Sequence, residues 1–135
     1  MSAYVFLDRI LDCEPGTRVV AIKALAFNEE FFRDHFPGKP VLPGAMILEG
    51  FVQAGRHCLA EREGWHDRWT LHEVGGMRFN RFAVPGEVLK LEAEFDKSDN
   101  SAGEKDALWF KGKASVDGTG VCRLRFALIE YDPDE

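Results

Sequence analysis

Residues 43–63, PGAMILEGFVQAGRHCLAERE, form the most unusual stretch of the sequence. Pro43 stands at its start, and between Ala45 and Ala54 apolar residues occupy almost every face of a helical turn. A proline before the first turn is typical of a helix start, and a helix that is apolar all round is buried rather than amphipathic. The stretch therefore predicts one long helix, beginning near Gly44, that the rest of the chain encloses.

Alternating apolar and charged residues predict the strands around this helix. The alternation is clear over residues 89–95 and 109–128, and the second range contains the turn sequence Asp117-Gly118-Thr119-Gly120. Residues 17–27 and 70–79 are two further predicted strands, residues 5–12 (VFLDRILD) have the spacing of a short helix, and residues 97–106 are a predicted polar loop. Strands with one solvent-exposed face, together with a buried helix, predict an α+β fold in which an antiparallel sheet wraps around the helix.

Length and charge narrow the classes of function. The 135 residues fit one domain over 1–135. The net charge of −6 argues against a nucleic-acid partner. Asp8 and Arg9 interrupt the first apolar stretch, which a signal peptide would not do, and no apolar run approaches the roughly 20 residues of a membrane span. We expect a cytoplasmic protein without a membrane partner.

Cysteine and histidine spacing argues against disulfides and metal sites. The three cysteines are far apart and odd in number, which predicts free, buried thiols in a reducing compartment. His57, His66 and His72 lack the spacing of metal ligands, so no metal is expected.

Candidate chemistry lies in residues 35–53. Three prolines and two glycines give the ten residues from His35 to Gly44 a fixed, irregular backbone. His35, with a reference pKa of about 6.5, suits a general base. Glu49 is an acidic residue on an apolar helix, where burial would raise its pKa and make it a general acid. Gln53 at i+4 is placed to orient Glu49, and Gly44 at the helix start offers a free N–H to an enolate-like oxygen.

These parts suit removal of a proton beside a carbonyl and loss of a β-hydroxyl. Each residue also has a structural explanation: a histidine held in a loop, a glutamate at a rim or in an ion pair, a glycine in a turn. Taken without further comparison, the residues leave both readings open.

The stretch HFPGKPVLPGAMILEGFVQAG resembles the signature of 3-hydroxyacyl-[acyl-carrier-protein] dehydratases of type II fatty acid synthesis. The similarity extends to LDRIL, EPG, FNEEFF and RFNRFAVPGE, and so covers most of the chain. The resemblance implies a hot-dog fold, with His35 as catalytic base and Glu49 as acid from opposite protomers of a homodimer. It implies that Gly44 polarises the thioester carbonyl, that Gln53 supports Glu49, and that no metal or organic cofactor is needed. Members of the family often assemble further, as trimers of dimers.

The implied reaction converts a (3R)-3-hydroxyacyl thioester into a trans-2-enoyl thioester, with the acyl group on the phosphopantetheine arm of acyl carrier protein. A sister group that also isomerises the double bond has Asp where this chain has Glu49, which favours simple dehydration. Candidates for an acyl tunnel are Val41, Leu42, Met46 and Phe82, although ordinary core packing is the alternative for each. Candidates for docking the acidic carrier are Arg33, Lys39, Arg78, Arg81 and Lys111, with solvated surface charge as the alternative.

Some residues depart from the family pattern. Arg56 follows Gln53 where small residues are usual and is placed to pair with a carboxylate, Val74-Gly75-Gly76-Met77 lacks an acidic residue, and loop 97–106 is long. They suggest a specialised dehydratase for a dedicated acyl pathway. A non-catalytic binding protein for acyl thioesters or carrier protein, and a hot-dog thioesterase, are the alternatives. The sequence leaves open the acyl chain length, the pathway, the choice between dimer and hexamer, and the docking surface.

Overall fold

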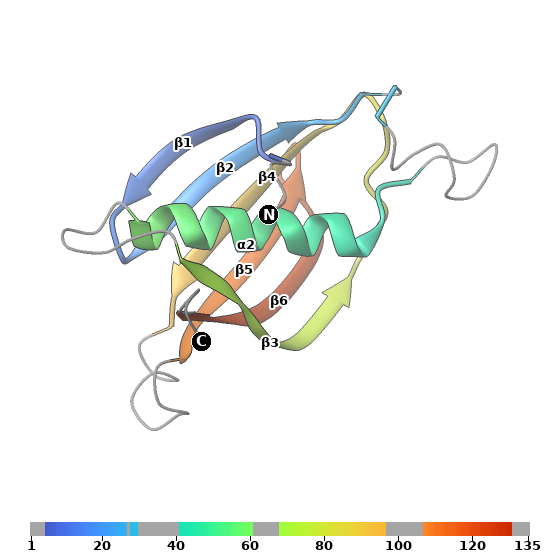
Figure 1. The fold of residues 1–135 in the computed structure, drawn as a ribbon. Helices are drawn as coiled ribbons and strands as arrows, with labels where there is room; N and C mark the ends of the chain where they lie inside the picture. The colour runs from blue at the N-terminus through green and yellow to red at the C-terminus, as the bar shows by residue number, and fades with distance from the viewer. Residues whose placement is uncertain (1–4, 27, 30–40, 61–67, 97–106, 131–135) are drawn as a thin grey trace.

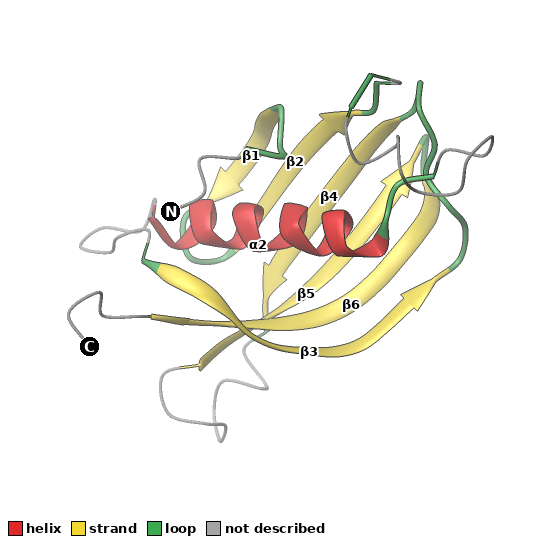
Figure 2. Cartoon of the chain, turned by 45° about the vertical axis from the view of Figure 1, so that its right-hand side comes forward, coloured by secondary structure: helices red, strands yellow, loops and turns green. Residues whose placement is uncertain are grey.

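A computed structural model describes residues 5–26, 28–29, 41–60, 68–96 and 107–130. Within these residues a six-stranded antiparallel sheet curves around one helix, α2 (Gly44–Ala60), which crosses its concave face (Figures 1 and 2). The strands are β1 (Arg9–Glu14), β2 (Arg18–Ala24), β3 (Trp69–Phe79), β4 (Val88–Phe95), β5 (Ala107–Val116) and β6 (Thr119–Glu130). Their order across the sheet is β1-β2-β4-β5-β6-β3. The predicted sheet around a helix is confirmed.

The β5–β6 hairpin shows how the sequence sets this sheet locally. Asp117 (φ 49°) and Gly118 (φ 80°) connect the strands. Positive φ at both central residues is the hairpin geometry that matches the right-handed twist of the flanking strands, and Asp-Gly is a preferred pair for it. The resulting register places Lys111 opposite Arg125 and Lys113 opposite Arg123.

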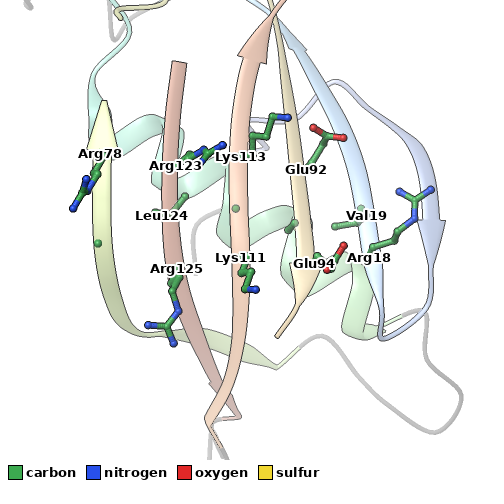
Figure 3. A pocket seen from close by; sticks show the side chains of 13 residues that line it. Arg18, Val19, Arg78, Glu92, Glu94, Lys111, Lys113, Arg123, Leu124 and Arg125 are labelled. Atoms are coloured by element: carbon green, nitrogen blue, oxygen red, sulfur yellow. The ribbon is translucent and has the colours of Figure 1, made fainter. Parts of the chain in front are cut away.

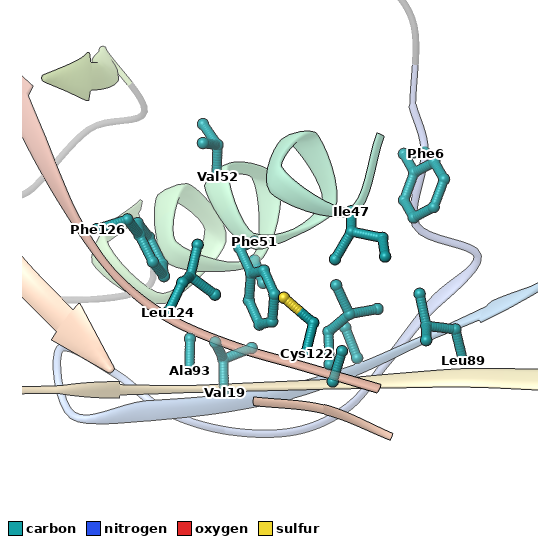
Figure 4. Packing of buried hydrophobic residues seen from close by; sticks show 14 of the residues in the cluster. Phe6, Val19, Ile47, Phe51, Val52, Leu89, Ala93, Cys122, Leu124 and Phe126 are labelled. Carbon is teal, nitrogen blue, oxygen red and sulfur yellow. The ribbon is translucent and has the colours of Figure 1, made fainter. Parts of the chain in front are cut away.

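The core fills the space between α2 and the concave face of the sheet. Phe51 and Ile47 point from the helix towards the strands, and Leu124 and Phe126 of β6 lie beside Phe51 (Figure 4). The Phe51 and Phe126 ring centroids are 5.9 Å apart. Gly112 lies beneath this contact, because a Cβ there would come within 2.9 Å of the Phe51 ring and 2.8 Å of Leu124. Close packing of one aromatic ring against the sheet thus explains a glycine in a strand.

The expected helix over residues 5–12 is wrong. Residues 9–14 form β1, which pairs with β2 from Arg9 opposite Ile22 to Glu14 opposite Arg18. The backbone hydrogen bonds offered by the edge of β2 outweigh a weak local periodicity. The other predicted elements are confirmed with small shifts at their ends, and loop 97–106 lies outside the described residues.

The single chain covers only part of the apolar surface of α2. Ile47, Phe51, Ala54 and Cys58 are buried, whereas Ala45 is exposed and Met46 and Leu48 are only partly buried. One sheet can cover one side of a helix, so the apolar residues on the remaining side keep contact with solvent in a monomer.

Candidate active site

Glu49 lies half-buried in the second turn of α2, with one carboxylate oxygen held by a neighbour. Gln53 Nε2 donates a hydrogen bond to Glu49 Oε1 at 3.1 Å. The side-chain oxygen of Gln53 accepts two backbone N–H bonds, from Phe6 at 2.8 Å and Leu7 at 3.3 Å. Because those donors require an oxygen, they fix which end of the Gln53 amide faces Glu49. The carboxyl group is thereby oriented through Gln53 by a backbone segment 46 residues away in the sequence.

Lys23 of β2 anchors the backbone segment that contains Phe6 and Leu7. This lysine points from β2 to the inner side of the sheet and is 8% exposed. Its Nζ lies 3.1 Å from Glu29 Oε2, 3.6 Å from Asp8 Oδ1 and 5.5 Å from the centre of the Phe6 ring. A buried ammonium group needs such anionic partners. Lys23 therefore contacts residues on both sides of Leu7, namely Phe6 and Asp8. These contacts hold in place the backbone N–H groups of Phe6 and Leu7 that orient Gln53.

The N-terminus of α2 lies five residues before Glu49, which is about 7.5 Å along a helix axis. Met46 and Ile47 N–H donate to the carbonyl of Pro43, whereas the first N–H groups of a helix have no carbonyl four residues back to receive them. A Cβ on Gly44 would come within 2.9 Å of the Phe79 ring. Gly44 thus brings a half-exposed aromatic ring against the positively polarised end of the helix that carries Glu49.

Comparison with known proteins identifies the family. The model of the FabA-like domain matches residues 2–125. The 3-hydroxyacyl-[acyl-carrier-protein] dehydratase FabZ of Herpetosiphon aurantiacus is 37% identical over 130 residues, covering 94% of this chain and 89% of that protein. The protein of the same name from Anaeromyxobacter sp. (strain K) is 39% identical over 134 residues, covering 96% and 82%. This chain belongs to the 3-hydroxyacyl-[acyl-carrier-protein] dehydratase family.

Solved structures agree with the family in fold. A chain of a dehydratase heterocomplex from Xenorhabdus doucetiae superposes with a TM-score of 0.65 at 20% identity, covering 90% of this chain and 97% of that chain. An uncharacterized protein from Pyrococcus horikoshii superposes with a TM-score of 0.70 at 12% identity, covering 95% and 85%. At such identities the likeness concerns the hot-dog fold, which the chain shares.

The expected tunnel residues of this dehydratase-family chain lie in different surroundings. Leu42 is 2% exposed and belongs to the core, with its N–H bonded to the carbonyl of Ala83. Val41 and Met46 are partly buried, and Phe82 is 63% exposed. His35, the expected base, lies outside the described residues, so its distance from Glu49 stays a prediction.

The expected docking residues do not lie together. Arg78 and Lys111 lie on the outer face of the sheet, the face turned away from α2, together with Lys113, Arg123 and Arg125 (Figure 3). Lys113, Arg123 and Arg125 are not among the predicted site residues, although the alternation over 109–128 predicts that they face solvent. Arg33 and Lys39 lie outside the described residues.

Arg81 is engaged in a local contact instead. Its guanidinium group pairs with Glu87, whose other oxygen accepts the Val84 N–H at 2.9 Å. Burial favours the protonated form of Glu87, but the hydrogen bonds from Arg81 and Val84 and the Arg81 charge outweigh it and hold the pKa of Glu87 below its usual value of 4.5. This pair closes the turn before β4.

The remaining polar residues of interest also have structural surroundings. Arg56 Nε donates to the carbonyl of Trp69 at 2.9 Å, so the structure gives it a backbone partner rather than the expected carboxylate. Cys58 and Cys122 are buried free thiols, and burial raises the pKa of Cys122 to about 11.

Among the described residues, no group of three or more His, Cys, Asp or Glu side chains is arranged to hold a metal ion. None of the helices described is long and apolar enough to cross a membrane.

Proposed function

We propose that this chain removes water from (3R)-3-hydroxyacyl thioesters carried by acyl carrier protein and releases trans-2-enoyl thioesters. The observation that carries the proposal is the setting of Glu49. A carboxyl group stands on the apolar helix with one oxygen held by Gln53, in a chain whose curated relatives bear the name of that dehydratase.

In the proposed reaction, His35 removes a proton from the carbon next to the thioester carbonyl. Negative charge then develops on the carbonyl oxygen, and the N–H groups at the start of α2 stabilise it. Glu49 donates a proton to the β-hydroxyl group as its C–O bond breaks, so that water leaves and the double bond forms. Because Gln53 occupies Oε1, Oε2 is the oxygen that faces the hydroxyl. One proton is taken and one is given, so the reaction balances without a cofactor.

We further propose that the working unit is a homodimer. Two surfaces favour it: the side of α2 bearing Ala45, Met46 and Leu48, which is incompletely covered, and the outer edge of β3, an 11-residue strand that ends the sheet of the described residues. A long unpaired edge invites pairing with another chain, and symmetric dimers use the same patch on both subunits. The resemblance adds that His35 and Glu49 of one site then come from opposite protomers.

The activity is tested with a short 3-hydroxyacyl-carrier-protein thioester and its enoyl counterpart, followed by absorbance and mass spectrometry. We expect interconversion of the two by the wild-type protein and its collapse in His35→Ala, with unchanged secondary structure. Release of free thiol instead would favour a thioesterase. Binding of the carrier without turnover would favour a non-catalytic binding protein, and equal efficiency on short and long acyl chains would contradict a specialised substrate range.

The shared site is tested by mixing two inactive variants, His35→Ala and Glu49→Gln, under conditions that exchange subunits. If each site takes one residue from each protomer, a mixed dimer contains one intact site, and random mixing restores about a quarter of wild-type activity. If both residues come from the same protomer, no mixed dimer has an intact site and activity stays absent.

A further inference from the structure

Lys23 of β2 is the one buried cation among the residues that the structure describes. It follows Val19 and Ala21 in the row of β2 residues that face the core, and it is 8% exposed. A lysine is almost never buried unless it is paired. Replacing a buried ion pair by apolar residues of similar volume is often neutral or even stabilising. Stability alone therefore does not explain an ammonium group at this core position.

The contacts of Lys23 tie the segment of residues 6–8 to β2. Asp8 donates its backbone N–H to the carbonyl of Ile22 at 2.9 Å, and its Oδ2 accepts the Ala24 N–H at 2.6 Å. Lys23 Nζ lies 3.6 Å from the other oxygen, Oδ1, and 5.5 Å from the centre of the Phe6 ring. Both the backbone and the side chain of Asp8 are thus fixed against the strand.

The same segment contacts the helix that carries the candidate acid. The N–H groups of Phe6 and Leu7 donate to Gln53 Oε1. Gln53 Nε2 then donates to Glu49 Oε1 at 3.1 Å. Phe6 lies beside α2 (Figure 4), and its ring is so close that a Cβ on Gly50 would come within 2.9 Å of it. A shift of this segment would therefore move the groups that orient Glu49.

Lys23 also keeps two carboxylates together. Its Nζ lies 3.1 Å from Glu29 Oε2, so Glu29 and Asp8 both lie against the same nitrogen. Without the ammonium group these two negative charges would repel each other. The side chain of Asp8 is 45% exposed and that of Glu29 is 17% exposed, so Asp8 is the one free to turn towards water. Its movement would draw residues 6–8 away from their place.

We propose that Lys23 is a positioning residue for the dehydration, because it holds residues 6–8 where they orient Gln53 and, through it, the carboxyl group of Glu49. The inference rests on the proposed role of Glu49 as the acid. Lys23 acts through other residues and touches neither the substrate nor the reacting carboxyl group. Its loss should lower kcat and leave KM almost unchanged, since the substrate keeps its contacts.

The test compares full-length variants that circular dichroism shows to be folded. Lys23→Met removes the charge and keeps the length of the side chain. Asp8→Asn weakens the same pair but keeps an oxygen for the Ala24 N–H, and it carries the comparison if Lys23→Met does not fold. Val19→Ala is the matched control, because Val19 is fully buried on the same side of β2 and takes no part in the contacts of Lys23.

A second measurement needs no substrate. Gln53 is the single glutamine of the sequence, so isotope labelling of glutamine nitrogen gives one side-chain amide signal in an NMR spectrum. That amide is the group that donates to Glu49. The position of the signal therefore reports directly on the contact that Lys23 is proposed to maintain.

We expect Lys23→Met to lower kcat at least about tenfold with KM within about twofold, since a misplacement of about 1 Å is enough for such a loss. The Gln53 signal should shift, and Asp8→Asn should change both readouts in the same direction. Val19→Ala should lower the unfolding midpoint by leaving a cavity but change neither readout. In a Gln53→Leu background, Lys23→Met should lower kcat by less than about threefold more, because the two residues act in one chain of contacts.

An unchanged kcat in folded Lys23→Met, or a lower kcat without a shift of the Gln53 signal, would overturn the proposal. Equal changes in Val19→Ala, or an equal fall in kcat in the Gln53→Leu background, would overturn it as well. A wild type without turnover would instead contradict the proposed dehydration, and the NMR comparison would still decide whether Lys23 orients Gln53.

Discussion

Strand β5 has two sides that differ sharply in chemistry. Phe110, Gly112 and Ala114 face α2 and are buried, whereas Lys111 and Lys113 between them face outward and are exposed. On the inner side even the polar groups have partners: Gln53 bonds Glu49 and two backbone amides, and Lys23 contacts two carboxylates. On the outer side most of the cations have no ion pair within the described residues.

The two sides of the sheet determine different properties of the molecule. Stability and the orientation of Glu49 depend on the inner side, where the loss of one contact leaves a cavity or an unpaired buried group. The outer side lacks such packing, because its charged side chains are exposed to solvent, so substitutions there should change the unfolding free energy little. Substitutions on the two sides should therefore differ in size and even in sign.

The largest effect on stability is expected from Phe51→Ala. Phe51 is fully buried and lies against Phe126 and above Gly112, so its truncation leaves a cavity and should cost about 3–5 kcal/mol of unfolding free energy. Lys113→Ala on the outer side should stay within about 0.5 kcal/mol of the wild type. Urea unfolding followed by circular dichroism measures both, and similar costs for the two would break the contrast.

A smaller effect, on activity rather than on folding, is expected from Gln53→Glu. The new side chain still offers an oxygen to the Phe6 and Leu7 amides, but it places a second carboxyl group where Glu49 now receives a hydrogen bond. We expect kcat to fall about 10- to 100-fold with little change in KM. An unchanged kcat in the folded variant would show that Gln53 does not position Glu49.

Arg81→Met should have a modest effect that depends on pH. The lowered pKa of Glu87 means that its ionised form is favoured in the folded chain, so the contribution is present at neutral pH and disappears as the pH falls below 4.5 through the lowered folded-state value. Since both side chains are partly exposed, the variant should lose about 1 kcal/mol or less at pH 7. Urea unfolding at pH 7 and at acid pH measures it, and a larger loss in acid would contradict the assignment.

The smallest effect, and one of opposite sign, is expected from Lys113→Gln. Removing this charge relieves its repulsion with Arg123, so stability should stay equal or rise by up to about 0.5 kcal/mol. High salt should erase any gain. A clear loss of stability at low salt would mean that Lys113 has a stabilising role in the chain itself.

The sequence was sufficient for features that depend on neighbouring residues. Apolar density around 45–54 predicted α2, strict alternation predicted β4 to β6 and which of their residues face outward, and Asp117-Gly118 predicted the hairpin. The pairing of Glu49 with Gln53 followed from the i+4 spacing of a helix and is confirmed.

Features that depend on distant parts of the chain were not predicted. β1 forms because the edge of β2 is available to it, and its own residues favoured a helix. The bonds from Phe6 and Leu7 to Gln53 join residues 47 and 46 positions apart. Arg78 joins the cations of β5 and β6 only because β3 lies next to β6 in the sheet, an order that no local pattern encodes.

The most direct test of the central claim is the turnover of purified Glu49→Gln on the 3-hydroxyacyl-carrier-protein thioester. Glutamine keeps the size of the side chain and an oxygen for the Gln53 N–H but cannot give up a proton to the hydroxyl. We predict a fall in kcat of about 10²–10⁴-fold with an unchanged unfolding midpoint. Turnover within about threefold of the wild type in the folded variant, well short of what the loss of a general acid costs, would contradict the assignment of Glu49 as the acid.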